Sequence, residues 1–203
     1  MQYEEFISLR EFSKGKENKV THAWKLAKYY YEIGEYSPAL YFFSYAAEHS
    51  VDDLLSYECL MMISLCFKGQ GDKETSRMNA LETAISLYPL RPEAFYLKSR
   101  CYLENGMYDD CLKCIEYAYS KMYYMSSDYG NGRNDQTVII SWGIEYFGVT
   151  HFQYIKGLCH YYKGDHQSAL ECFDAISEVV YTDLPLEDGL TFKKVYEELK
   201  VNK

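Results

Sequence analysis

Long hydrophobic runs are missing from this 203-residue sequence. No apolar stretch approaches the ~20 residues that a membrane-spanning helix requires, so we expect no membrane span. The N-terminal segment MQYEEFISLREF carries early acids and no apolar core, which argues against a signal peptide. Basic residues are also few: 21 Lys and Arg stand against 30 Asp and Glu, for a net charge of -9. This balance indicates an acidic, solvated surface and argues against nucleic-acid binding, which requires a basic stripe.

What the sequence does contain is a repeated pattern, in which a Tyr-rich helical stretch ends at a glycine and a second helix follows. The four glycines are Gly34, Gly71, Gly106 and Gly164. The first three are 37 and 35 residues apart, and the fourth follows 58 residues later, which is one period plus an insertion. A period in the mid-thirties is typical of stacked helical hairpins. We therefore expect an all-α fold that offers a binding surface.

Residue types recur at fixed distances from each turn glycine. Small residues lie seven positions before it and five after it: Ala27, Ser64, Ser99 and Gly157, then Ala39, Ser76, Cys111 and Ala169. Rings lie four positions before it: Tyr30, Phe67, Tyr102 and His160. Small residues let two antiparallel helices approach closely, and the rings fill the remaining space. In the second repeat the later positions slip by one, to Leu81 and Ala84, so we expect an extra residue in its turn or second helix.

This pattern resembles the tetratricopeptide repeat (TPR) family, most clearly in HAWKLAKYYYEIGEYSPALYFFSYAA and RPEAFYLKSRCYLENGMYDDCLKCIEYAY. The resemblance covers residues 20–119 as repeats 1–3 and residues 150–177 as repeat 4. It departs from the family at Lys73 and His166, which stand where an aromatic residue is usual. The resemblance implies a right-handed α-α superhelix of four helical hairpins with additional terminal helices.

The remaining segments flank or interrupt the repeats. Residues 1–19 predict a short helix and a loop, and residues 120–149 form an insertion dense in turn-forming residues. Residues 178–203 predict a helix that caps the end of the repeats, because its apolar residues share one face. These residues are Phe192, Val195, Tyr196 and Leu199. We expect the whole chain, residues 1–203, to form a single solenoid.

Three further segments carry a narrower resemblance: SVDDLLSYECLMMISLCF, SLYPLRPEAFYLKSRCYLENG and TVIISWGIEYFGV. Their order is similar to that in the repeat arrays beside sugar-transferring domains of some bacterial and viral glycosyltransferases. This resemblance implies an accessory or C-terminal repeat module that positions a transferase or its glycan acceptor. It implies no activity for this chain, because the sequence has no Asp-x-Asp motif and no α/β region long enough for a transferase.

Candidate sites for chemistry are weak throughout the sequence. The Cys111-x-x-Cys114 motif lacks a second cysteine pair, and cysteines recur at equivalent repeat positions, which is typical of packing residues. Cys159 and His160 are adjacent and so point in different directions on a helix, which argues against a catalytic pair. We therefore expect no catalytic residue, no metal and no cofactor. An odd number of cysteines, seven, without an export signal indicates reduced thiols and a cytoplasmic location.

The first helix of each hairpin is expected to line the concave face of such an array. Its candidate partner-binding residues are Trp24, Lys28, Tyr31, Met61, Tyr96, Arg100, Tyr154 and Tyr161. The alternative for any one of them is that it contacts the next hairpin and completes the core. An aromatic groove with a few cations suits a segment of a protein partner, or a sugar ring stacked on Trp24 or Tyr96. We expect no binding of a chaperone C-terminal tail, because only Lys28 and Arg100 could hold its carboxylate. The leading hypothesis is a non-catalytic protein-protein interaction scaffold, and the alternative is the glycosyltransferase module.

Overall fold

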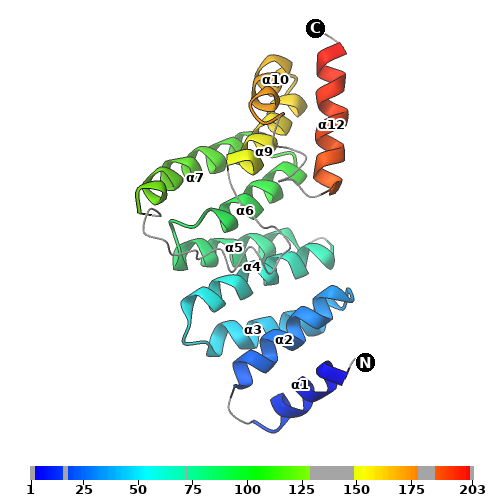
Figure 1. Ribbon diagram of the computed structural model, residues 1–203, viewed down its shortest axis with the longest axis vertical. Helices are drawn as coiled ribbons and strands as arrows, with labels where there is room; N and C mark the ends of the chain where they lie inside the picture. Colours follow the sequence, from blue (N-terminus) through cyan, green and yellow to red (C-terminus); the bar gives the residue numbers. More distant parts are fainter. Residues whose placement is uncertain (1–2, 16–17, 72, 129–148, 178–185, 202–203) are drawn as a thin grey trace. The chain divides into compact units, whose positions relative to one another are not determined.

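The fold is entirely helical in the part of the chain that the structure describes. The computed structural model describes residues 3–15, 18–71, 73–128, 149–177 and 186–201. Ten helices and no strand occur within these ranges, which confirms the expected all-α class (Figure 1). The chain divides into two compact units, Met1–Pro89 and Leu90–Lys203, and each has its own buried core.

The N-terminal unit consists of one helix followed by two helical hairpins. Its elements are α1 (Tyr3–Ser13), α2 (Lys19–Glu32), α3 (Tyr36–His49), α4 (Asp53–Gly69) and α5 (Glu74–Leu87). Helix α2 packs on α3, α4 packs on α5, and α3 joins the two hairpins by packing on α4. Phe12 of α1 meets the rings of Phe42 and Tyr45 edge to face, with centroids 5.2 and 5.0 Å apart. Aromatic contacts of this geometry add to the stability gained by burial, so they stabilise the packing of α1 on the first hairpin.

The C-terminal unit contains two further hairpins and the last helix. Its elements are α6 (Pro92–Glu104), α7 (Tyr108–Asp128), α9 (Val149–Tyr162), α10 (His166–Asp174) and α12 (Leu186–Val201). Helix α6 packs on α7, α9 on α10, and α12 on α10. Helix α7 extends into the expected insertion as far as residue 128, and the rest of that insertion lies outside the described residues. The link before α12, residues 178–185, also lies outside them.

The hairpin turns at Gly34, Gly106 and Gly164 share one hydrogen-bond pattern. At the first turn the N–H of Gly34 donates to the carbonyl of Tyr31 (3.0 Å), and the N–H of Glu35 donates to that of Tyr30 (2.8 Å). The same pair of bonds recurs around Gly106 and Gly164. This is the Schellman motif, which satisfies two carbonyls at a helix end and requires a left-handed residue. Gly34 has a φ of 78°, a conformation that glycine adopts without steric cost.

Small residues lie where the helices of a hairpin come closest, as the sequence pattern predicts. Ala27 and Ala39, on α2 and α3, are completely buried. In the last hairpin Gly157 of α9 faces the ring of Phe173 on α10. A methyl group at Gly157 would lie only 2.7 Å from Cδ1 and 2.8 Å from Cζ of that ring. The close approach of α9 and α10 therefore depends on the missing side chain.

The second hairpin has the extra residue that the sequence predicts, but the shift begins earlier than expected. Leu81 and Ala84 are completely buried, which confirms the slip by one residue. Ser76, assigned to the small contact position, is only half-buried, and the buried residue is its neighbour Arg77. The extra residue therefore lies in the hairpin turn between Gly71 and the start of α5 at Glu74. As a result an arginine occupies the place that Ala39 has in the first hairpin.

Candidate protein-interaction surface

The candidate surface of the N-terminal unit is one face of α2. Trp24, Lys28 and Tyr31 follow a spacing of four and three residues, which places them on the same side of a helix. The adjacent side, with Ala23, Leu26 and Ala27, is buried, and α2 packs on α3. All three candidate side chains are half-buried, so each keeps part of its surface accessible.

Trp24 and Lys28 form the centre of this face. The Lys28 ammonium lies 4.7 Å from the Trp24 ring centroid, within the range of a cation–π interaction. Within the part of the chain that the structure describes, Lys28 forms no ion pair. The Trp24 Nε1 atom is buried and makes no hydrogen bond there. The accessible part of the Trp24 side chain is therefore hydrocarbon, and a positive charge lies directly beside it.

Tyr31 continues the same face toward α3 and α4. Its ring meets that of Tyr36 edge to face, with centroids 5.8 Å apart. Burial raises the pKa of the Tyr31 hydroxyl, and the nearby Cys66 on α4 and Tyr36 raise it further. The hydroxyl is therefore neutral over the whole physiological pH range. Met61 of α4 is completely buried, so it is part of the core and contributes nothing to the accessible surface.

In the C-terminal unit two of the candidate residues are core residues. Tyr96 is 3% exposed and Tyr154 is 2% exposed. The ring of Tyr96 meets His151 and Phe152 of α9 edge to face, with centroids 5.7 and 6.0 Å apart. Tyr96 and Tyr154 therefore fit the alternative that a candidate residue contacts the next hairpin: they complete the packing between α6 and α9.

Arg100 and Tyr161 remain partly accessible in this unit. Arg100 lies over the Tyr96 ring, and its Nη1 is 3.4 Å from the Tyr96 hydroxyl. Tyr161 donates a hydrogen bond to the Glu198 carboxylate of α12 (2.9 Å), and this bond raises the pKa of its hydroxyl. Both side chains are held by neighbours of the same unit, whereas Lys28 contacts only Trp24 among the interactions described for it.

The cysteines behave as packing residues. All seven are free, and six of them are buried. The Cys111 thiol donates to the carbonyl of Ser99 (3.1 Å), and its pKa is raised chiefly by a hydrogen bond with Cys159. Burial raises the pKa of Cys66 to about 12. Thiols with raised pKa values are poor nucleophiles and poor metal ligands. Among the described residues no group of three or more His, Cys, Asp and Glu side chains could hold a metal ion.

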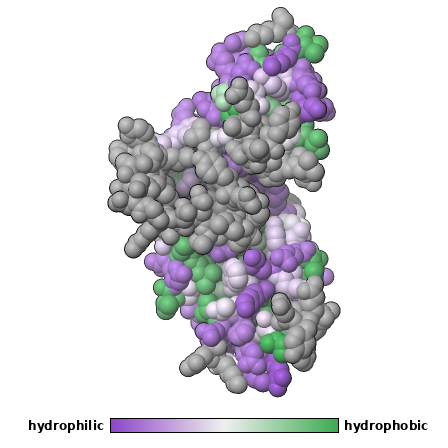
Figure 2. Space-filling model, viewed as in Figure 1, coloured by the Kyte–Doolittle hydropathy of each residue, from purple (hydrophilic) through white to green (hydrophobic). Residues whose placement is uncertain are grey.

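The described residues on the face shown in Figure 2 are mixed in character. Figure 2 shows that, on the face in view, the described residues are mainly hydrophilic and the hydrophobic ones form small separate groups. No helix in the described ranges has the length and apolar character needed to cross a membrane.

Comparison with known proteins supports the repeat architecture. No family model matches the chain, and no curated protein sequence matches it. A crystal structure of MamA is similar with a TM-score of 0.58 and 19% identity, covering 96% of this chain and 87% of that one. A second structure, MamA MSR-1 C2, gives a TM-score of 0.51 and 13% identity, covering 91% of this chain and 98% of that one. MamA is a TPR-like all-α solenoid, so the likeness confirms the TPR-like fold predicted from the sequence. At these identities the likeness concerns the fold alone.

One surface feature was missed in the sequence. The helical spacing of Phe192, Val195, Tyr196 and Leu199 predicts the inward face of α12; Phe192, Val195 and Leu199 are buried, and Tyr196 is half-buried. The other face, in the segment LTFKKVYEELKV, carries an ordered series of charges between two exposed apolar residues, Leu190 and Val201. The sequence feature that could have revealed it is the order of charges between the buried positions, two lysines followed by two glutamates.

Proposed function

We propose that this chain is a non-catalytic protein-interaction scaffold that binds a segment of a partner protein on the α2 face. The observation that carries the proposal is the pair formed by Trp24 and Lys28: a partly accessible hydrocarbon ring beside an ammonium group without an ion-pair partner in the described residues. Protein interfaces concentrate their binding energy in such aromatic anchors and in the charges around them. The TPR-like framework supplies a rigid support for the pair.

The chemistry of this face defines the partner segment. A hydrophobic side chain on the partner would pack on the accessible edge of Trp24, with Tyr31 beside it. An acidic side chain four residues away on a helical segment, or two away on an extended one, would pair with Lys28. Binding of this kind needs no change in backbone conformation, because α2 is already fixed by its contacts with α3.

The second candidate function is the accessory role beside a glycosyltransferase. The observation in its favour is the partly accessible Trp24 ring, since sugars stack on exposed aromatic rings. Two facts make it the weaker candidate. One face of the Trp24 ring is already occupied by Lys28, and Tyr96, the other ring considered for a sugar, is buried.

We also propose that the chain acts in a reducing compartment such as the cytoplasm. The support is that all seven cysteines are free and that the thiols of Cys59, Cys66 and Cys111 have raised pKa values. Such thiols pack as small apolar groups, a role that requires no oxidising environment.

The experiment compares capture of protein partners by the wild type and by the double variant W24A/K28E. We expect an interaction with an identified partner to weaken by about 30-fold or more, since loss of a hot-spot residue costs at least ~2 kcal/mol. The matched control is Y41A/K73E in the same unit, because Tyr41 is 60% exposed on α3 and Lys73 is exposed before α5. Equal recovery of partners by all three proteins would refute the α2 site. A glycan array run on the same three proteins tests the second function. A sugar signal lost only in W24A/K28E would mean that the ligand of the α2 face is a glycan and not a protein segment.

A further inference from the structure

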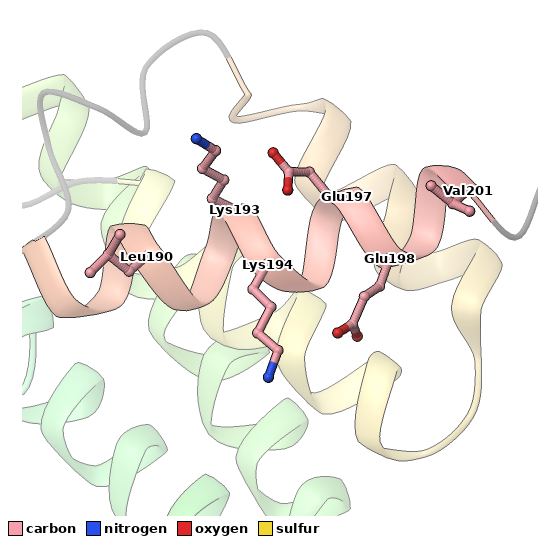
Figure 3. Close-up of a pocket in the computed structure, with 6 residues that line it drawn as sticks. All are labelled: Leu190, Lys193, Lys194, Glu197, Glu198 and Val201. Atoms are coloured by element: carbon pink, nitrogen blue, oxygen red, sulfur yellow. The ribbon is translucent and has the colours of Figure 1, made fainter.

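The outward face of α12 has an unusual order of residues. Phe192, Val195 and Leu199 turn inward and are buried. The outward side chains line a shallow depression along the helix (Figure 3): Leu190, Lys193, Lys194, Glu197, Glu198 and Val201. Leu190 is 61% exposed and Val201 is 85% exposed, so both ends of this face present apolar surface to solvent.

The charges of this face are arranged symmetrically about its middle. Two lysines follow the N-terminal apolar residue, and two glutamates precede the C-terminal one. Positions 190, 193 and 194 are as far from the midpoint as positions 201, 198 and 197 on the other side. Figure 3 shows Lys193 and Glu197 on one edge of the helix and Lys194 and Glu198 on the other. Each edge therefore has a positive half and a negative half.

We propose that this face binds the same face of a second copy of the chain, with the two α12 helices antiparallel about a twofold axis. In this arrangement Lys193 faces Glu197 of the other copy along one edge, and Lys194 faces Glu198 along the other. Leu190 packs near Val201 at each end. Because a twofold axis repeats every contact, the dimer contains four Lys–Glu pairs and two apolar contacts.

The charge order selects this arrangement over the other simple one. Parallel α12 helices would place lysines opposite lysines and glutamates opposite glutamates, which is repulsive. The antiparallel pair converts the same side chains into attractive partners. An unrelated protein would need the complementary series of charges at the same spacing, whereas a second copy has it by symmetry.

The structure also holds one of these charges in place. The Tyr161 hydroxyl donates to Oε2 of Glu198, which orients that carboxylate on the helix surface. A side chain that is already ordered loses less conformational entropy on binding. The contact spans three turns of one helix, about 16 Å, so the interface is small and the dimer is weak and concentration-dependent. Its charge pairs are exposed, so association weakens as the salt concentration rises.

The test is a charge-swap experiment on the full chain, read by sedimentation equilibrium and by fluorescence anisotropy of labelled protein. The variant K193E/K194E makes the whole face negative, and E197K/E198K makes it positive. We expect each variant alone to raise the dimer dissociation constant by at least ~10-fold, because four attractive pairs become repulsive. An equimolar mixture of the two restores association, since every Lys then faces a Glu again.

A control and a folding check keep the result interpretable. The control K25E/K113E changes the net charge as much as K193E/K194E does, at exposed lysines of α2 and α7, and is expected to dimerise as the wild type does. Circular dichroism establishes that the variants are folded, which matters for E197K/E198K because it removes the Tyr161 hydrogen bond. A wild type that stays monomeric at millimolar concentration overturns the proposal. So does a mixture of folded variants that fails to associate, or a control that weakens association equally.

Discussion

Replacing Gly157 by alanine tests the close packing of α9 on α10. In a helix interior, alanine is favoured over glycine by about 1 kcal/mol. Here the added methyl group would lie 2.7 and 2.8 Å from two atoms of the Phe173 ring, well inside ordinary contact distance. The ring is completely buried and meets Phe192 edge to face at 5.3 Å, so a shift of the ring has to displace buried neighbours.

The expected magnitude follows from these two opposing effects. Overpacking of a tight core costs about 1–3 kcal/mol, so G157A should be destabilised by up to about 2 kcal/mol after the helix-propensity gain. Gly189 of α12 is the matched control, because a methyl group there meets nothing within 4 Å. The G189A variant should gain up to about 1 kcal/mol. The difference between the two variants isolates the steric effect.

Urea unfolding followed by circular dichroism measures both variants, and thermal unfolding provides a second reading at about 2–4 °C per kcal/mol for a chain of this size. The double variant G157A/F173L identifies the contact, since a smaller side chain at position 173 should recover about 1–2 kcal/mol of coupling energy. Equal shifts for G157A and G189A, or strict additivity with F173L, would refute the assignment of Phe173 as the limiting contact.

Two further predictions concern buried ionisable groups. The Arg91 Nη2 atom lies 2.7 Å from Oε1 of Glu93, and the two side chains are 8% and 3% exposed. The E93Q variant should therefore lower the free energy of unfolding by about 1.5–3 kcal/mol. Urea titration measures this change, and a change as small as that of an exposed substitution would contradict the pairing. The Cys66 thiol keeps its proton to about pH 12 in the folded state and only to about 9.0 when unfolded. Above pH 9.0 the unfolded chain loses this proton while the folded chain keeps it, which favours the unfolded state. The stability that the protonated thiol contributes is therefore complete below pH 9.0 and is lost as the pH rises toward 12, so the free energy of unfolding should fall across that window. C66A should show a shallower fall than the wild type, and parallel curves would exclude Cys66 as the cause.

The sequence predicted the features that depend on local geometry. The turn glycine Gly34 and the ring of Tyr30 lie four residues apart, within a single Schellman motif, so a short pattern was enough to place the turn. The small residues Ala27 and Ala39 were equally visible, because two helices of one hairpin must approach at a fixed distance from their turn.

The candidate site was less predictable, because accessibility depends on distant residues. Spacing placed Tyr96 on a definite side of α6, but the residues that cover it, His151 and Phe152, come from α9, beyond an insertion. Trp24 and Lys28 stay accessible on the equivalent face of α2. A repeat pattern fixes which side of a helix a residue occupies, and the neighbouring helices decide whether that side is open.

Arg77 shows a second limit of the repeat pattern. It is buried at 6% exposure, where the corresponding residue of the first hairpin is an alanine. A single extra residue at the turn rotates α5 by about 100° in register; counting from Gly71 revealed the shift at Leu81 and Ala84 but not that it already applies at position 76. Which side of α5 faces α4 is set by the packing of the two helices.

The hairpin turns also bear on how the chain reaches its structure. Each turn brings together helices that are adjacent in sequence, such as α2 with α3 and α4 with α5. Closing so short a loop loses little chain entropy, and local contacts of this kind form quickly. In arrays of similar units, folding can start in any unit and spread to its neighbours. Because three turns carry the same hydrogen bonds, we expect folding of this chain to be able to start at more than one hairpin.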